Sequence, residues 1–420
     1  MGNLTKSIVL VIVALFLTSL VTVPSAILVK AETTWSVQTI DKNAVGAGFI
    51  AVDSNNNPHI VYRDYFLGNE TGYVMYASWN GSNWSIQQVT SDFGAMDFAL
   101  DLNNNPHILC CNGTDLRDLV YASWTGSNWT FQIVESQLYY LQYAALALDS
   151  DGNPHIAYSF LRVVENQTVI GEGYVLKYAS WTNSGWHFER VDSGITDKPF
   201  SLAIDSAGIE HIMYLQSQEL VYAVSSSSGW NKQTVLENDP WVSNMVLDSS
   251  GYPNFIYLLK SLDDPDNAFM FCRWNGSDWS SQEVTSNGTF NSINFGFLAL
   301  DQHNYPHIDF CNNHALMYAT WNGTNWDIQK VVESNASGPG PLKIDSKGNP
   351  HISYGGTWTV YSLSYQMYAS TAETSGNLPS QPNIPITIAV TVVVVLAAVI
   401  VLLFLYNRYR KTLSQNKPNV

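Results

Sequence analysis

The chain has 420 residues, which is enough for two or three average domains or for one large repeat domain. It carries 35 acidic and 19 basic residues, so its formal charge is −16, and aromatic residues make up 13% of it. This charge repels nucleic acid and anionic lipid, which excludes functions that depend on binding phosphate.

Residues 1–31 are predicted to be a signal peptide. Lys6 supplies the basic start, residues 8–23 form an apolar run, and small residues lead to a predicted cleavage site after Ala31. This order is typical of secretory signals. Because the apolar run is long, a retained signal anchor is the alternative. If the signal peptide is cleaved, the exported protein begins at Glu32.

A turn-and-strand motif then occurs seven times: an Asp, a polar turn, Pro-His and an apolar strand. The first copy is DSNNNPHIVY at residues 53–62, and successive copies are 43 to 56 residues apart. One four-stranded blade of a β-propeller has this length. We number the repeats one to seven by their anchoring aspartates. These are Asp53, Asp101, Asp149, Asp205, Asp248, Asp301 and Asp345.

A second motif follows each Asp turn, as in YASWNGSNWSIQQV at residues 76–89. Its alternating residues and Asn-Gly-Ser turn predict a β-hairpin. The seventh repeat ends at Thr371 without its Trp strand, whereas residues 35–40 match residues 84–89. We therefore predict an all-β fold at residues 32–372, a seven-bladed β-propeller closed by the N-terminal strand.

Each repeat is expected to supply four strands. The innermost precedes the Asp, the second begins at Pro-His, the third is Tyr-Ala-Ser-Trp, and the outermost begins at the second Trp. The turns between strands one and two and between strands three and four then share one edge, which we call the turn rim. The other connections vary in length and share the opposite edge, the loop rim. Variable loops on a rigid frame are where binding residues usually lie.

The loop rim holds the candidate ligand-binding residues. Aromatic rings with nearby carboxylates are the usual means of stacking on a sugar or gripping a peptide. Packing among the loops is the alternative explanation for each of them. The candidates are Tyr65, Tyr139, Tyr140, Tyr143, Trp241, Trp358, Asp263, Asp264 and Asp266.

Two patterns resemble metal sites, but both have a simpler explanation. Asp149 and Asp151 are the one local candidate for calcium, yet the other repeats do not keep a calcium ligand set at these positions, so turn capping is favoured. One His occurs in each of six repeats, too far from the others to share a zinc ion. We expect a repeated structural hydrogen bond there, and neither a metal nor a cofactor. These are His59, His107, His155, His211, His307 and His351.

Ten Asn-x-Ser/Thr sequences lie in the exported region and are candidates for N-glycosylation if the host performs it. They are Asn69, Asn80, Asn83, Asn112, Asn128, Asn166, Asn275, Asn287, Asn322 and Asn335.

The C-terminal segment is predicted to cross a membrane once. Residues 386–406 are uncharged and rich in Val, Ile and Leu, which is long enough to span a bilayer as a helix. Arg408, Arg410 and Lys411 follow, as expected on the cytoplasmic side. Residues 373–385 are predicted to be a stalk and residues 407–420 a cytoplasmic tail.

The repeats also resemble known families. The Asp-Ser-x-Gly-Asn-Pro-His-Ile motif looks like the repeat of NHL-type propellers, and Ser-Trp-Asn-Gly-Ser-Asn-Trp resembles the Asp-box of sialidase (BNR) propellers. With a signal and a C-terminal anchor, the chain is also similar to surface propellers of archaea. Sialidase activity would imply an arginine triad, but the exported part has five arginines and no motif that marks such a triad.

The leading hypothesis is a membrane-tethered, extracellular and non-catalytic module that binds a glycan or a protein at the loop rim. A sialidase-like or other polysaccharide hydrolase or lyase is the first alternative. A structural protein of the cell envelope is the second. No nucleic acid partner is expected.

Overall fold

The computed structural model describes residues 34–371 except 45, 65–71, 92, 114–115, 165–167, 260–267, 287–295, 334–335 and 358–363. The predicted signal peptide, stalk, membrane helix and tail lie outside these residues. Within them, no helix is long and apolar enough to span a membrane. All described strands belong to one compact unit of the chain.

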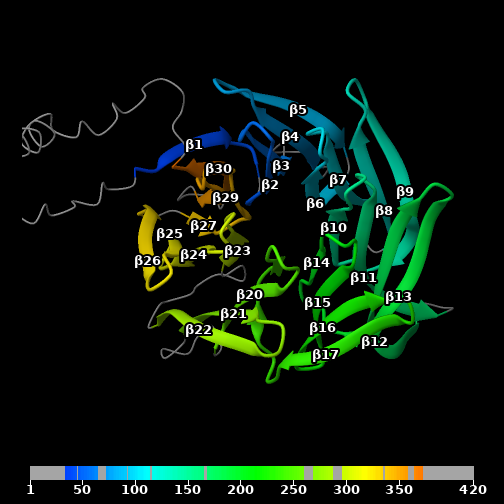
Figure 1. Ribbon diagram of the computed structural model, residues 1–420. Coiled ribbons are helices and arrows are strands. Elements are labelled where there is room, and N and C mark those ends of the chain that lie inside the picture. Colours follow the sequence, from blue (N-terminus) through cyan, green and yellow to red (C-terminus); the bar gives the residue numbers. More distant parts are fainter. Residues whose placement is uncertain are drawn as a thin grey trace, which may run out of the picture. The chain divides into compact units, whose positions relative to one another are not determined.

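The repeats fold as antiparallel sheets of four strands, in the predicted inner-to-outer order (Figure 1). The first repeat forms β2 (Phe49–Val52), β3 (Pro58–Asp64), β4 (Tyr73–Trp79) and β5 (Trp84–Ser91). Its register aligns the buried residues Ile50, Ile60 and Ala77 across three strands. Five consecutive residues of β3, Pro58 to Tyr62, are buried, as expected of a strand that is covered on both faces.

The remaining repeats follow the same plan. The second repeat has β6 (Phe93–Leu100), β7 (Pro106–Asn112), β8 (Leu116–Trp124) and β9 (Trp129–Tyr139). The third has β10 (Tyr143–Leu148), β11 (Pro154–Val164), β12 (Thr168–Thr182) and β13 (Gly185–Ile195). The fourth has β14 (Ser201–Ile204), β15 (Glu210–Gln216), β16 (Glu219–Ser226) and β17 (Gly229–Leu236). One residue pair, Ile195 with Gln216, joins the third and fourth into an eight-stranded sheet.

The inner strands of the fifth and seventh repeats are divided in two. The fifth repeat has β18 (Trp241–Val242), β19 (Val246–Leu247), β20 (Pro253–Leu258), β21 (Ala268–Trp274) and β22 (Trp279–Ser286). The sixth has β23 (Gly296–Leu300), β24 (Pro306–Asn312), β25 (Ala315–Trp321) and β26 (Trp326–Val332). The seventh has β27 (Ala336–Gly338), β28 (Leu342–Ile344), β29 (Pro350–Thr357) and β30 (Ser364–Ser370).

The N-terminal strand completes the seventh repeat, as predicted. β1 (Ser36–Asp41) pairs with β30, and Ser36 lies opposite Ser370. The inner strands β2, β6, β10, β14, β19, β23 and β28 contact one another in this order, and β28 contacts β2. The first and last repeats are therefore neighbours in space as well as partners through β1.

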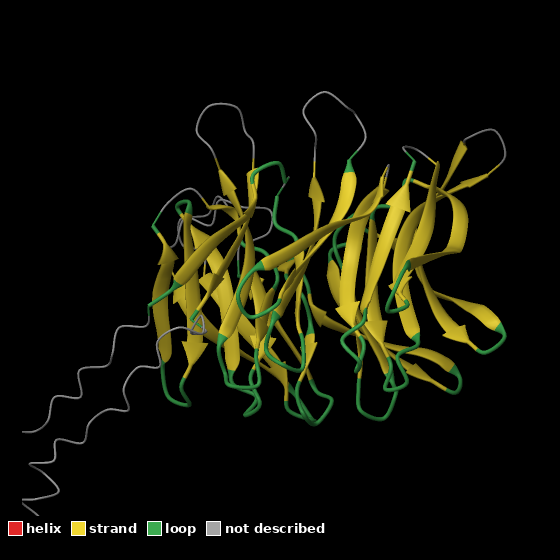
Figure 2. Cartoon of the chain, turned by 90° about the horizontal axis from the view of Figure 1, so that it is seen from above, coloured by secondary structure: helices red, strands yellow, loops and turns green. Residues whose placement is uncertain are grey.

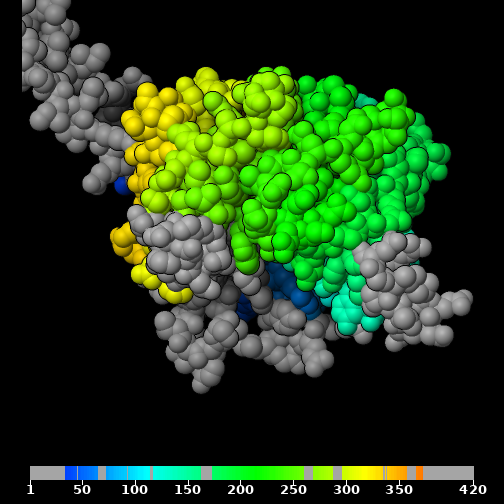
Figure 3. Space-filling view, turned by 90° about the horizontal axis from the view of Figure 1, so that it is seen from below, coloured from blue at the N-terminus to red at the C-terminus, as the bar shows by residue number. Residues whose placement is uncertain are grey.

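Aromatic contacts join each repeat to the next. The outer-strand Trp of one repeat meets the third-strand Tyr or Phe of the preceding repeat, with ring centroids 5.1–6.0 Å apart and steep interplanar angles. Edge-to-face contacts of this kind add to the burial of apolar area. Trp84 makes the same contact with Tyr368, across the junction of the first and last repeats. Figure 3 shows successive repeats packed side by side, from green to yellow along the chain.

The turn rim is built from one hydrogen-bond pattern. In the first repeat the Asp53 carboxylate accepts the N–H groups of Asn55 and Asn57, which closes the turn. Asn56 sits at φ 66° and accepts the N–H of Ser346 from the seventh repeat. Asn104 and Asn304, also at positive φ, bind a serine of the preceding repeat in the same way. Figure 2 shows these short turns, in green, along one edge of the sheets.

Candidate functional site

The inner strands surround a cavity of about 860 Å³. Every repeat contributes to its lining, together with residues 197–200 and 241–244 from two connections of the loop rim. Most lining side chains are apolar. The charged ones in the described lining are Asp97, Asp197, Lys198 and Lys343. A large apolar cavity with a few charged groups is the usual form of a ligand site.

Trp241, on a connection of the loop rim, lies in the lining of this cavity. It begins the short strand β18, which pairs with Leu258 of β20, so its backbone is fixed by the sheet. The Lys198 ammonium is 5.4 Å from the centre of the Trp241 ring and 2.5 Å from Asp239 Oδ1. The cation and the carboxylate together hold the half-buried indole in place. The indole also packs against the core around Ile256 and Leu258, so only part of it lines the cavity.

Tyr143 lines the same cavity at the start of β10. Burial raises the pKa of the Tyr143 hydroxyl, and the nearby Asp197 and Tyr174 raise it further. The hydroxyl therefore stays protonated at neutral pH and can donate and accept hydrogen bonds. Trp241 and Tyr143 are two sequence-predicted residues that the fold brings to one cavity.

The other predicted ligand-binding residues are not at this cavity or cannot be placed. Tyr139 and Tyr140 are not in its lining and instead pack edge to face, 4.5 Å between centroids. Five further candidates lie outside the described residues: Tyr65, Trp358, Asp263, Asp264 and Asp266.

Asp97 is a cavity residue that sequence reasoning missed. Its two carboxylate oxygens accept the N–H of Phe98 at 2.8 Å and the N–H of Leu146 at 2.7 Å, so it links β6 to β10. Ser201 and Asn244, at the equivalent place in their repeats, accept N–H groups of the following repeat in the same manner. Burial raises the pKa of Asp97 to about 6, although both N–H groups and Lys343 act in the opposite direction.

The repeated histidines form the expected structural hydrogen bonds. In six repeats His Nδ1 contacts the third-strand Tyr hydroxyl, and Nε2 faces the anchoring Asp at 3.4–3.7 Å. Burial lowers the pKa of His59, His107, His211 and His307, so these rings are neutral. A neutral ring can accept the Tyr proton at Nδ1, whereas Nε2 of these four histidines faces the Asp beyond hydrogen-bond distance. His155 also faces Glu210 of the following repeat.

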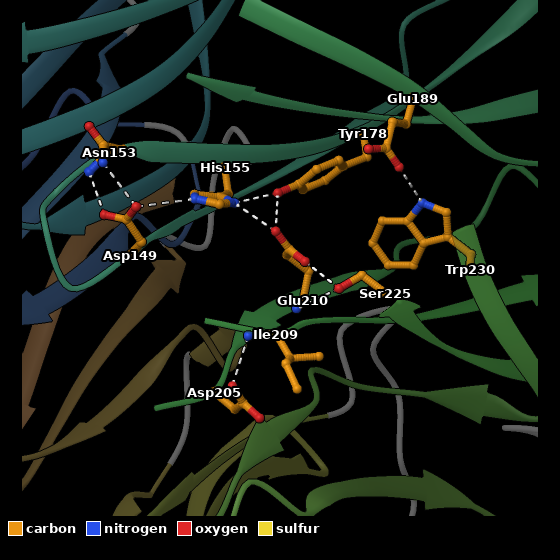
Figure 4. A network of polar contacts seen from close by, with 10 residues as sticks. All are labelled: Asp149, Asn153, His155, Tyr178, Glu189, Asp205, Ile209, Glu210, Ser225 and Trp230. Carbon is orange, nitrogen blue, oxygen red and sulfur yellow. Dashed lines mark hydrogen bonds and ion pairs between the residues drawn. The ribbon is translucent and has the colours of Figure 1, made fainter. Parts of the chain in front are cut away.

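Asp149, the candidate calcium ligand, uses its carboxylate to accept hydrogen bonds within its own turn. Asp149 Oδ1 accepts the N–H group of Asp151. Oδ1 also accepts the N–H group of Asn153, and Oδ2 accepts a hydrogen bond from the Asn153 side-chain amide (Figure 4). Among the described residues, no group of three or more His, Cys, Asp or Glu side chains is arranged to hold a metal ion.

The junction of the third and fourth repeats carries an additional carboxylate (Figure 4). Glu210 stands where the six other repeats have Pro. It accepts hydrogen bonds from Tyr178 and Ser225 and lies 3.3 Å from His155 Nδ1. Burial would raise the pKa of Glu210, but His155, Ser225 and Tyr178 outweigh it and lower the pKa to about 2. This network ties the two repeats together and is not part of the cavity lining.

The predicted glycosylation acceptors fall into three groups. Asn80, Asn83, Asn128, Asn275 and Asn322 are exposed at hairpin turns of the turn rim. Asn112 is half-buried, and its side-chain oxygen accepts the N–H of Asp118. The remaining four, Asn69, Asn166, Asn287 and Asn335, lie outside the described residues.

Comparison with known proteins shows which solved structures have a similar fold. No family model and no curated protein matches this sequence. An ulvan lyase of polysaccharide lyase family 25, bound to -[GlcA(1-4)Rha3S]-, matches with TM-score 0.52 at 11% identity, over 78% of this chain and 94% of its own. The polysaccharide lyase Uly1 matches with TM-score 0.50 at 10% identity, over 80% and 98%.

A fucose-specific lectin from Aleuria aurantia matches with TM-score 0.46 at 14% identity, over 70% of this chain and 97% of its own. At such low identity the likeness to the two lyases concerns the fold alone. The chain is an all-β protein whose repeated four-stranded sheets are arranged as in β-propellers.

Proposed function

We propose that the chain is a seven-bladed β-propeller that binds a glycan in its central cavity without modifying it. Seven copies of the motif, the pairing of β1 with β30, and the contact of β28 with β2 support the number of blades and their closure. The cavity is the feature common to all repeats and the place where two predicted binding residues meet.

The observation that carries the proposal is the Trp241 ring on the cavity lining. A sugar presents an apolar C–H face and a polar rim of hydroxyl groups. The indole provides the flat apolar surface for that face, and Lys198, Asp197 and the Tyr143 hydroxyl provide the polar partners. The cavity volume of about 860 Å³ is within the range of sites for small ligands.

The test is a glycan array probed with the full-length chain, followed by calorimetry on the ligands it retains. Trp241→Ala is expected to weaken binding at least tenfold, since a central aromatic contact contributes about 2 kcal/mol or more. Tyr305→Ala is the control, because Tyr305 is 41% exposed and outside the cavity. Retention of full affinity by Trp241→Ala, or the absence of any retained glycan, would contradict the proposal.

One observation favours the enzymatic alternative. A carboxyl group with a raised pKa in a cavity is suited to act as a general acid, and Asp97 has a pKa of about 6. Both of its oxygens are occupied by backbone N–H groups, which favours a structural role. Turnover of a labelled polysaccharide panel, abolished by Asp97→Asn, would establish a hydrolase or lyase instead of a binding module.

The location of the protein is proposed from its sequence. The basic and apolar start of residues 1–31, the uncharged residues 386–406 and the cationic cluster after them support an exported propeller tethered by one helix. The NHL-like and BNR-like resemblance and the archaeal surface type stay predictions. Protease treatment of intact cells that removes the propeller but protects a tag after Val420 would support this topology. Co-purification with the envelope lattice would favour the structural alternative.

A further inference from the structure

One inner-strand position breaks the pattern of the repeats. Two residues before each anchoring Asp, five repeats have Ala and the fifth has Val, but the seventh has Lys343. A departure from an otherwise consistent local pattern often marks a functional position. The residues at this position are Ala51, Ala99, Ala147, Ala203, Val246, Ala299 and Lys343.

The structure places this lysine inside the cavity. Lys343 is the middle residue of β28, opposite His351, and its side chain belongs to the lining together with Ala51, Ala99 and Val246. The Lys343 side chain is exposed to the cavity, and the surrounding inner strands lower the pKa of its ammonium while Asp97 acts to raise it. An ammonium group on the wall of a mostly apolar cavity is a ready hydrogen-bond donor for an anionic group of a ligand.

No described side chain supplies an anion at close range. Within the described residues, no hydrogen bond or ion pair within 4 Å engages the Lys343 ammonium. Asp97 is the carboxylate that acts on it, but both Asp97 oxygens already accept backbone N–H groups. The three N–H donors of Lys343 therefore face the cavity without a partner from this part of the chain.

We infer that Lys343 is an anion-binding residue and that the ligand of the central cavity carries a carboxylate or sulfate group. This inference rests on the proposed glycan-binding function and narrows it to acidic glycans. The exterior of the predicted exported part, with 13 basic and 35 acidic residues, repels such a ligand. Recognition must then come from the local contacts at Lys343 and Trp241.

The decisive experiment compares two oligosaccharides that differ in one group. A glucuronate-containing tetrasaccharide and its carboxyl-reduced, neutral form are titrated into the full-length chain by calorimetry. The acidic form is expected to bind about 10- to 100-fold more tightly, as hydrogen bonds to a charged group typically contribute. A sulfated tetrasaccharide titrated in parallel distinguishes the two anionic groups.

Substitutions then assign the preference to the lysine. Lys343→Gln and Lys343→Ala are expected to remove the preference for the acidic form over the neutral form. Lys343→Arg keeps the charge and is expected to retain most of the preference. Lys347→Gln, an exposed lysine on the turn rim, is the matched control.

The outcomes separate this inference from the function on which it rests. Equal affinity for both forms, with Trp241→Ala weakening each, would overturn the role of Lys343 and leave glycan binding intact. If neither form binds and the glycan array retains no ligand, the proposed glycan binding is contradicted, and inorganic sulfate is then titrated as the probe of the anion site. A saturable shift of the Lys343 ε-carbon NMR signal with sulfate would then support an anion site, and its absence would overturn the inference.

Discussion

The turn rim and the central cavity differ in where their polar residues occur along the repeats. On the turn rim the same residues recur from repeat to repeat, and Nδ1 of each repeated His contacts the Tyr hydroxyl of its own repeat. In the cavity the recurring positions are small or apolar, and charge is found at exceptions such as Lys343 and Asp97. The recurring residues of this molecule hold the sheets together, whereas the exceptions are either proposed ligand contacts or compensated changes.

The fifth repeat shows a compensated change on the turn rim. It has Asn254 where six repeats have His, and Phe271 where the same six have Tyr. Asn254 donates to the carbonyl oxygen of Tyr252 instead, and Phe271 needs no partner. Loss of both members together is expected if each His-Tyr pair acts as a unit, because removing one alone leaves a buried polar group unpaired.

The largest effect is expected from breaking such a set in the seventh repeat. His351→Ala removes a side chain that is 1% exposed, the acceptor for Tyr368 and the partner of Asp345. Two buried polar groups and a cavity remain, so the free energy of unfolding should fall by about 3 kcal/mol. Urea denaturation of the full-length chain measures it.

The fifth repeat provides the matched control for that prediction. Asn254→Ala loses one hydrogen bond to a backbone oxygen and is expected to cost about 1 kcal/mol. Asn254→His combined with Phe271→Tyr should be less destabilising than the sum of the two single changes. Equal losses for His351→Ala and Asn254→Ala would show that the Asp-His-Tyr set is not a stabilising unit.

A smaller and pH-dependent effect is expected at Glu210. Its pKa is lowered from 4.5 to about 2, so the ionised form stabilises the fold fully above pH 4.5 and loses this effect as the pH falls toward 2. Glu210→Gln should cost about 1–2 kcal/mol at pH 7, after allowance for solvent screening. Thermal denaturation between pH 7 and pH 2 checks this. The exposed Glu237→Gln serves as control, and a difference that does not change with pH would rule out the ionised carboxylate as the cause.

The smallest effect is expected at the turn-rim link between the first and last repeats. Asn56→Gly keeps a residue suited to φ 66° but loses both bonds to Ser346, at a cost of about 0.5–1 kcal/mol because the link is exposed. Asn56→Ala adds the strain of a Cβ at positive φ and should cost about 1 kcal/mol more. Asn304→Gly removes the equivalent link between the fifth and sixth repeats. If Asn56→Gly costs no more than a change at an unlinked surface residue, the link does not contribute to closure.

Much of the fold could be predicted because the same local sequence patterns recur in successive repeats. The Asp turn, the Trp hairpin and the missing seventh Trp strand are local patterns, and the pairing of Ser36 with Ser370 agrees with them. The links from Asn56, Asn104 and Asn304 were not predicted, although a signal was present. In each case Asn replaces the turn Gly and the preceding repeat carries a Ser at the second turn position.

The candidate site was only partly predictable. Trp241 and Tyr143 could be found as aromatic residues on loop-rim connections, and both line the cavity. Lys198 and Asp97 could not, because their contacts join residues that are 41 and 49 positions apart. Lys343 could have been found by aligning the repeats at the inner strand, where it stands among Ala and Val.

The pairing of β1 with β30 has a consequence for how the protein is made. Residue 36 emerges early in synthesis, but its partner, residue 370, emerges only after every repeat has been translated. During this interval β1 is an unpaired edge of the kind that attracts non-native strands. Each complete repeat can form its own hairpins as it appears, whereas the last sheet must wait for both ends. Closure is then a late event, and a ribosome that stalls before the final strand leaves a chain with two exposed edges.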